Sequence, residues 1–212
     1  MTRTEWVLGI LLAVLLIFIV ALGLIFWLQP GNNNNGSVVA VAPTSQFTGQ
    51  TAIQASLLAQ IEAAKWQSDA ALLKASATWP QGSSRETLLQ GKTTWSFTYY
   101  SPGAQETAVV TVVDEVATFG STRPAPGTLF PIDSGAWKID SHEAIQSFLD
   151  SGGGQFLSLS GVSTLTISLS KETDSNRMEW FLSLFSVSNS RSYTASIDAA
   201  SGEILNVIGP PQ

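Results

Sequence analysis

Residues 6–28 form an apolar run without a charged or strongly polar side chain. At a rise of 1.5 Å per residue, a helix of this length covers the hydrocarbon core of a bilayer, which is about 30 Å thick. Trp6 and Trp27 stand near the two ends, where indole rings favour the headgroup region. A cleaved signal peptide has a shorter apolar core and a small-residue cleavage site, whereas Gln29-Pro30 follows here. The pattern therefore predicts a retained membrane anchor of one transmembrane helix.

The orientation of this anchor rests on few charges. Arg3 precedes the apolar run, and no further Lys or Arg follows until Lys65. Because positive residues stay on the cytoplasmic side, we expect a short cytoplasmic tail and a C-terminal domain that is periplasmic or extracellular. Residues 29–50 include an Asn- and Gly-rich tract that cannot bury an apolar face and reads as a linker.

From Thr51 onward, apolar residues recur at helical spacing, which predicts an amphipathic helix. Its expected inward face consists of Ile53, Leu57, Ile61 and Ala64. The same composition continues beyond Trp66, so the helix is expected to continue or restart through Ala70, Leu72, Leu73 and Ala77. Pro80 and Gly82 would end it.

Runs rich in β-branched and aromatic residues follow at 94–100 and 108–113, and Pro102-Gly103 between them is a turn signal. The two runs predict an antiparallel hairpin. The Pro- and Gly-containing segment 120–127 interrupts the pattern and is expected to begin a linker between two halves.

The second half opens with helix signals. Asp140 with Glu143 three residues later predicts a helix start, and 151–154, with three glycines, predicts its end. The strand-like runs that follow lie at 164–170, 179–188, 192–198 and 204–208. Gly202 supplies the turn before the last of them.

The halves resemble diverged copies, because a Trp stands beside each helical stretch and another begins a strand of each half. The predicted fold class is α+β: an N-terminal single transmembrane helix followed by two related modules, each with a helix across an antiparallel sheet. The predicted divisions are a cytoplasmic tail at 1–5, the transmembrane helix at 6–28, a linker at 29–50, a first module at 51–120, a linker at 121–136 and a second module at 137–209.

The second half resembles the PepSY domain. The resemblance rests on the Ala144-Ile145 step in a short helix, the strand start Glu179-Trp180, and a closing segment at 193–205 that reads tyrosine, alternating strand, then Asp-Ala-x-x-Gly-Glu before an apolar residue. It covers 137–209, and 51–120 matches more loosely. The resemblance implies a small α+β module of bacterial exported and membrane-tethered proteins that acts as an inhibitor or binding module and carries no catalytic residues.

Composition excludes several classes of function. The chain has 212 residues, a formal charge of −6 and a pI near 4.6, so it lacks the basic surface that nucleic-acid binding requires. Without cysteine it has no disulfide, thiolate metal site or lipid-bearing cysteine. The single His142, in the first turn of a predicted helix, excludes paired-histidine zinc motifs and is interpreted as a surface turn residue. We expect no cofactor and no metal site, because 171–176 lacks the pattern of a calcium loop.

Aromatic residues are the remaining candidates for a functional role. Trp95 with Phe97, and Phe181 with Phe185, fall at even spacing on one strand face, which predicts that they pack in the core beneath the sheet. Trp79, Tyr100 and Phe130 stand at element ends and are expected to be exposed on a partner surface.

The sequence favours a non-enzymatic binding module, an accessory or stabilising subunit of a larger membrane protein complex, in contact with the lipid bilayer and a protein partner. The alternative is an inhibitor or regulator of an exported protease, which the PepSY resemblance implies. An enzyme that uses Asp or Glu pairs is a third reading, for which no motif is present.

Overall fold

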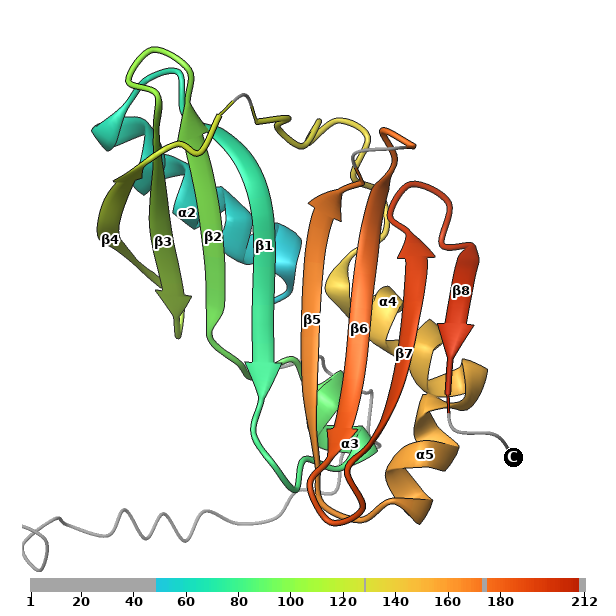
Figure 1. The fold of residues 1–212 in the computed structure, drawn as a ribbon. Helices are drawn as coiled ribbons and strands as arrows, with labels where there is room; N and C mark the ends of the chain where they lie inside the picture. Colours follow the sequence, from blue (N-terminus) through green and yellow to red (C-terminus); the bar gives the residue numbers. More distant parts are fainter. Residues whose placement is uncertain (1–48, 128, 173–174, 210–212) are drawn as a thin grey trace, which may run out of the picture. The chain divides into compact units, whose positions relative to one another are not determined.

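Eight strands form one antiparallel sheet in the computed structural model, in the order β4-β3-β2-β1-β5-β6-β7-β8 (Figure 1). The structure describes residues 49–127, 129–172 and 175–209. The strands are β1 (Ala71–Trp79), β2 (Trp95–Ser101), β3 (Glu106–Val113), β4 (Val116–Pro124), β5 (Ser163–Lys171), β6 (Met178–Ser186), β7 (Arg191–Asp198) and β8 (Ile204–Ile208).

The helices within residues 49–209 lie against one face of this sheet (Figure 1). They are α2 (Ala52–Trp66), α3 (Arg85–Leu89), α4 (Ser141–Phe148) and α5 (Gly154–Leu159), and a π-helical turn, η1 (Leu149–Gly153), joins the last two. Thr51 and Gln54 form a capping box at the start of α2. Asp140 caps α4 by accepting a hydrogen bond from the Ser141 N–H, which confirms the predicted helix start.

The predicted fold class is wrong, because the two halves do not build separate modules. β1 pairs with β2 on one side and with β5 on the other, so the strands of both halves form one continuous sheet and the regular structure of the described residues is mostly β. The register between the halves runs from Lys74 opposite Ser170 to Trp79 opposite Leu165.

The helix predicted through Ala70–Ala77 is also wrong, because this segment is β1. Its composition of Ala and Leu favours a helix, but Ala75, Ala77 and Trp79 alternate inward at strand spacing. Pairing on both edges satisfies the backbone of β1, and this tertiary gain outweighs the local preference.

Two further boundaries differ from expectation. The segment predicted to begin a linker at Gly120 belongs to β4, which follows a tight turn at Asp114 and Glu115, both with positive φ. Gly152, at φ 130°, breaks the helical backbone within the predicted helix end, but a second helix that was not predicted, α5, begins directly after this kink. The predicted hairpin is confirmed as β2 and β3, and the four later strands are confirmed as β5 to β8.

Four tryptophans connect the two halves in a single core beneath the sheet. The ring of Trp95 lies 6.2 Å from that of Trp79 and 6.3 Å from that of Trp180, and the ring of Trp180 lies 5.7 Å from that of Trp137. The indole N–H groups of Trp137 and Trp180 both donate to the carbonyl oxygen of Ile139, at 2.9 and 2.8 Å. The loop before α4 is thereby fixed to β6.

The two halves also meet at their helix starts. One carboxylate oxygen of Asp140 accepts from the N–H of Ser141 at 2.6 Å and from the N–H of Ile53 at 3.1 Å. The hydroxyl of Ser141 accepts from the N–H of Ala52 at 3.0 Å. Asp140 therefore supplies a partner to the exposed N–H groups of two helices, α4 and α2.

The transmembrane helix predicted for 6–28 lies outside the described residues, and so does the predicted linker at 29–50 up to residue 48. Among the helices within 49–209, none is long and apolar enough to cross a membrane.

Candidate interaction surface

The face of the sheet opposite the helices carries mainly hydroxyl side chains. Strand alternation directs the apolar residues of β5 and β6 toward the helices and every second residue away from them. We call the outward positions of β1, β2, β5, β6 and β7 the open face; they include Ser76, Thr78, Ser96, Thr98, Thr166, Ser168, Ser170, Phe181, Ser183, Phe185, Thr194 and Ser196. No helix among the described residues covers these positions.

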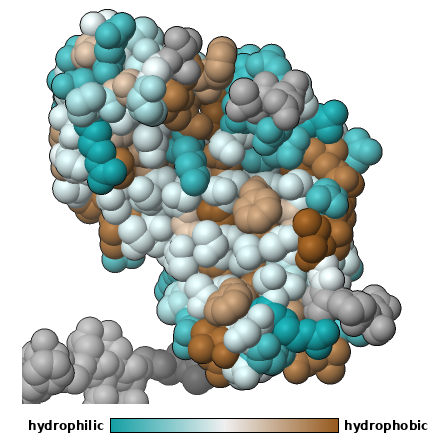
Figure 2. Space-filling model, in the orientation of Figure 1, coloured by the Kyte–Doolittle hydropathy of each residue, from teal (hydrophilic) through white to brown (hydrophobic). Residues whose placement is uncertain are grey.

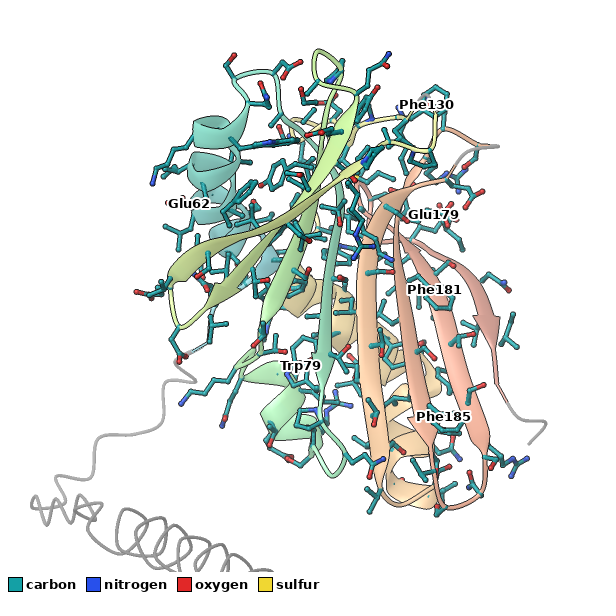
Figure 3. All side chains as sticks on the ribbon, turned by 60° about the vertical axis from the view of Figure 1, so that its left-hand side comes forward. Glu62, Trp79, Phe130, Glu179, Phe181 and Phe185 are labelled. Atoms are coloured by element: carbon teal, nitrogen blue, oxygen red, sulfur yellow. The ribbon has the colours of Figure 1, made fainter. Side chains whose placement is uncertain are left out.

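Two aromatic side chains interrupt this hydroxyl-rich surface. Phe181 and Phe185, four residues apart on β6, are 46% and 45% exposed (Figure 3). Their cross-strand neighbours are polar: Ser168 and Ser196 flank Phe181. Figure 2 shows this face as a mostly pale surface with separate brown patches. Aromatic rings set in a polar surround are typical of protein-binding surfaces.

A charged corner lies at one end of the open face. Glu179 and Asp198 stand directly opposite each other on β6 and β7. Burial, and then the nearby acidic groups, raises the pKa of Glu179, while Arg177 acts in the opposite direction. The Nε atom of Arg177 lies 3.6 Å from a carboxylate oxygen of Asp198.

Asp198 stabilises the turn after β7, because its carboxylate accepts hydrogen bonds from the N–H groups of Ala200 and Ser201. Burial pulls the pKa of Asp198 upward, but hydrogen bonds from the N–H groups of Ser201 and Ala200 outweigh it and hold this pKa below its usual value. Asp114, between β3 and β4, lies within a tight turn at φ 46°.

A groove of about 540 Å³ lies on the helix side, between α5, the start of β7 and the end of β8. Its walls include Phe156 and Leu159 from α5 and Val207 from β8, and Arg191 lies at its lining. Tyr193 lines the groove and donates its hydroxyl hydrogen to the carbonyl oxygen of Ser151 at 2.6 Å.

The exposed apolar residues of α2 lie where the sequence predicted a buried face. The face of α2 that packs on the sheet consists of small residues: Ala52, Ala55, Ala59 and Ala63. Leu57 and Ile61, predicted to face inward, are 60% and 57% exposed. The small alanine side chains allow the helix backbone to approach the sheet closely. The prediction from helical period, which placed the larger apolar residues inward, was therefore wrong for Leu57 and Ile61.

The three residues predicted for a partner surface do not share an environment. Trp79 is buried against Trp95, and Tyr100 is buried as well, so the exposure predicted for these two residues is wrong. Trp79 is buried although it is the last residue of β1, because its side chain points to the helix side of the sheet. Phe130 is exposed, as predicted, and lies beside Lys171, Glu172 and Asn176 (Figure 3).

The anchor residues Arg3, Trp6 and Trp27 lie outside the described residues. His142 lies in the first turn of α4, as predicted, and is half-buried; its Nδ1 atom is 3.1 Å from the carbonyl oxygen of Leu89 in α3. Within the described part of the chain, no three acidic or histidine side chains are placed to hold a metal ion.

Comparison with known proteins gives a likeness in fold. No family model and no curated protein matches the chain. The crystal structure of a candidate lipoprotein from Clostridium difficile 630 is similar, with a TM-score of 0.53 and 12% identity, over 78% of this chain and 97% of that one. At this identity the likeness concerns the fold alone, and the PepSY resemblance stays a prediction.

Proposed function

We propose that this protein is a membrane-tethered, extracytoplasmic protein-binding module that holds its partner on the open face. The observation that carries the proposal is the pair Phe181 and Phe185, exposed on a sheet face that no described helix covers. Side chains of this size would lose contact with water on binding, while the surrounding hydroxyl groups exchange hydrogen bonds with a partner.

Two observations support the location. The apolar run at 6–28 has the length and flanking indoles of a membrane anchor. The structural neighbour is described as a lipoprotein, a class held at a membrane by lipid, and this chain has no cysteine to carry such a lipid. An apolar helix would serve the same purpose here. The finer proposal is an accessory subunit of a membrane protein complex, and binding of this kind requires no catalytic residue.

The experiment compares two double variants of the tagged full chain, purified from native membranes. Phe181→Ser with Phe185→Ser alters the open face, and Leu57→Ser with Ile61→Ser removes a similarly exposed apolar pair from α2. We expect the first variant to lose the co-purifying partner, measured by quantitative mass spectrometry, and the second to retain it. Loss of the partner only in the α2 variant would place the contact on the helix and contradict the proposal.

Location is tested separately with intact spheroplasts. Protease added outside should digest the domain that follows residue 48, because Arg3 keeps the short tail inside. Full protection of that domain in intact spheroplasts, with digestion after lysis, would contradict an extracytoplasmic location.

A further inference from the structure

The two outer strands of the sheet differ in how their free edges are protected. β4 contains Gly120 and ends with Arg123 and Pro124, and its Phe119 packs against Trp66 of α2 with ring centroids 6.0 Å apart. A charge, a proline and a covering helix are devices that prevent a sheet edge from pairing with another chain.

β8 has none of these devices. It reads Ile204-Leu205-Asn206-Val207-Ile208, without a charge or a proline, and pairs only with β7 among the described strands. Ile204, Val207 and Ile208 are 39%, 41% and 63% exposed. After an irregularity at its start, β8 continues in regular register with β7 from Asn206 to Ile208.

We propose that β8 pairs with β8 of a second copy of this chain, antiparallel and with a two-fold axis at Asn206. Two apolar residues stand on each side of Asn206 in β8, so the strand has the same pattern of apolar and polar residues in both directions. Antiparallel pairing places Leu205 opposite the second copy's Val207 and the two Asn206 residues opposite each other. Every apolar residue then meets an apolar one, as an isologous interface requires.

The distribution of charge also favours a second copy of this chain as the partner of β8. Each copy has a net charge of −6, yet none of this charge lies within β8, so pairing sets no like charges opposite each other. Glu203 precedes β8, and Arg191 begins β7 at the other end of the paired region. The antiparallel arrangement brings Glu203 of each copy to the strand end near Arg191 of the other, so the flanking charges are opposite in sign.

The helix side of β8 offers further apolar contact. Val207 forms one wall of the groove whose other wall contains Phe156 and the exposed Leu159 of α5. An added strand would cover this wall as well as the strand edge. Because the axis is perpendicular to the sheet, both open faces of the dimer would lie on the same side. The dimer uses a surface separate from the open face, so it goes beyond the proposed function and either can fail alone.

The absence of cysteine in the native chain gives a direct test with the full chain in detergent. In Asn206→Cys, the two sulfur atoms would face each other across the axis, where opposed Cα atoms about 4.5–5.5 Å apart suit a disulfide. The matched control is Ser121→Cys, exposed on β4 and equally subject to any association through 6–28. We expect mild oxidation to give a reducible dimer of Asn206→Cys at several times the yield of Ser121→Cys. Equal yields would overturn the proposal.

A second variant tests the same edge without cross-linking. Asn206→Lys would place two ammonium groups at the axis and leave the buried face of the sheet unchanged. Light scattering should find a dimer for the native chain and a monomer for Asn206→Lys, with the same circular dichroism spectrum. A native chain that is monomeric at about 100 µM, or an Asn206→Lys chain that stays dimeric, contradicts pairing through β8.

Discussion

Trp180 and Phe181 are neighbours on β6, yet they belong to opposite sides of the molecule. Trp180 is fully buried, touches two other indole rings and donates a hydrogen bond to Ile139. Phe181 is nearly half exposed between two serines. The contrast teaches that apolar side chains on the helix side are buried and stabilise this fold, whereas those on the open face stay in contact with water, so we expect them to contribute little to stability.

The largest expected effect comes from removing Trp180. Trp180→Ala would leave a cavity beneath the sheet and the Ile139 carbonyl with one hydrogen bond fewer, at a cost of about 3–5 kcal/mol. We expect the free energy of unfolding, measured by chemical denaturation, to fall by this amount or the domain not to fold. A loss below about 1 kcal/mol would contradict the conclusion that apolar side chains on the helix side stabilise the fold.

Next in size is the loss of the shared helix cap. Asp140→Ala removes the acceptor of the Ser141 and Ile53 N–H groups, and we expect a cost of about 2 kcal/mol. Thermal unfolding measures the change. The control is Asp133→Ala, in the same loop, whose carboxylate accepts one local hydrogen bond from the Gly135 N–H. If both variants are destabilised equally, Asp140 does not connect the helix starts.

A smaller effect, of opposite sign, is expected for Glu179→Gln on the open face. The pKa of Glu179 is raised by burial and by nearby acidic groups, so its ionised form is less favourable in the folded than in the unfolded state. The penalty is present at neutral pH and disappears as the pH falls through this raised pKa and below the ordinary value of 4.5. We therefore expect Glu179→Gln to raise the melting temperature at pH 7 and to match the native chain near pH 3. A gain that is the same at both pH values would exclude the electrostatic explanation.

The smallest effect on stability is expected for Phe181→Ser. Its ring lies on a face that no described helix covers, so the free energy of unfolding should change by no more than about 0.5 kcal/mol. Chemical denaturation of this variant beside Trp180→Ala compares the two faces directly. A loss as large as that of Trp180→Ala would mean that the open face is itself packed in the folded chain.

Much of the fold followed from local pattern, and the failures have physical causes. The β2–β3 hairpin and β5 to β8 were predictable because β-branched and aromatic residues alternate there between well-marked turns. β1 was missed because its Ala and Leu residues favour a helix until partners are present on both sides. The candidate surface was not predicted. The even spacing of Phe181 and Phe185 predicted core packing for both, and this prediction is wrong, because the strand face that they share is not covered by a described helix.

By itself, the sequence determined the turns, most of the strands, the cap at Asp140 and the absence of any basic surface or cysteine chemistry, because each depends on residues close together in the chain or on composition. Tertiary structure decided what depends on distant segments. It inserted β1 between β2 and β5, turned the alanines of α2 toward the sheet and buried Trp79. It also left Phe181 exposed and β8 with a free edge, because burial and pairing are determined by which segments meet, and period alone does not specify the partner.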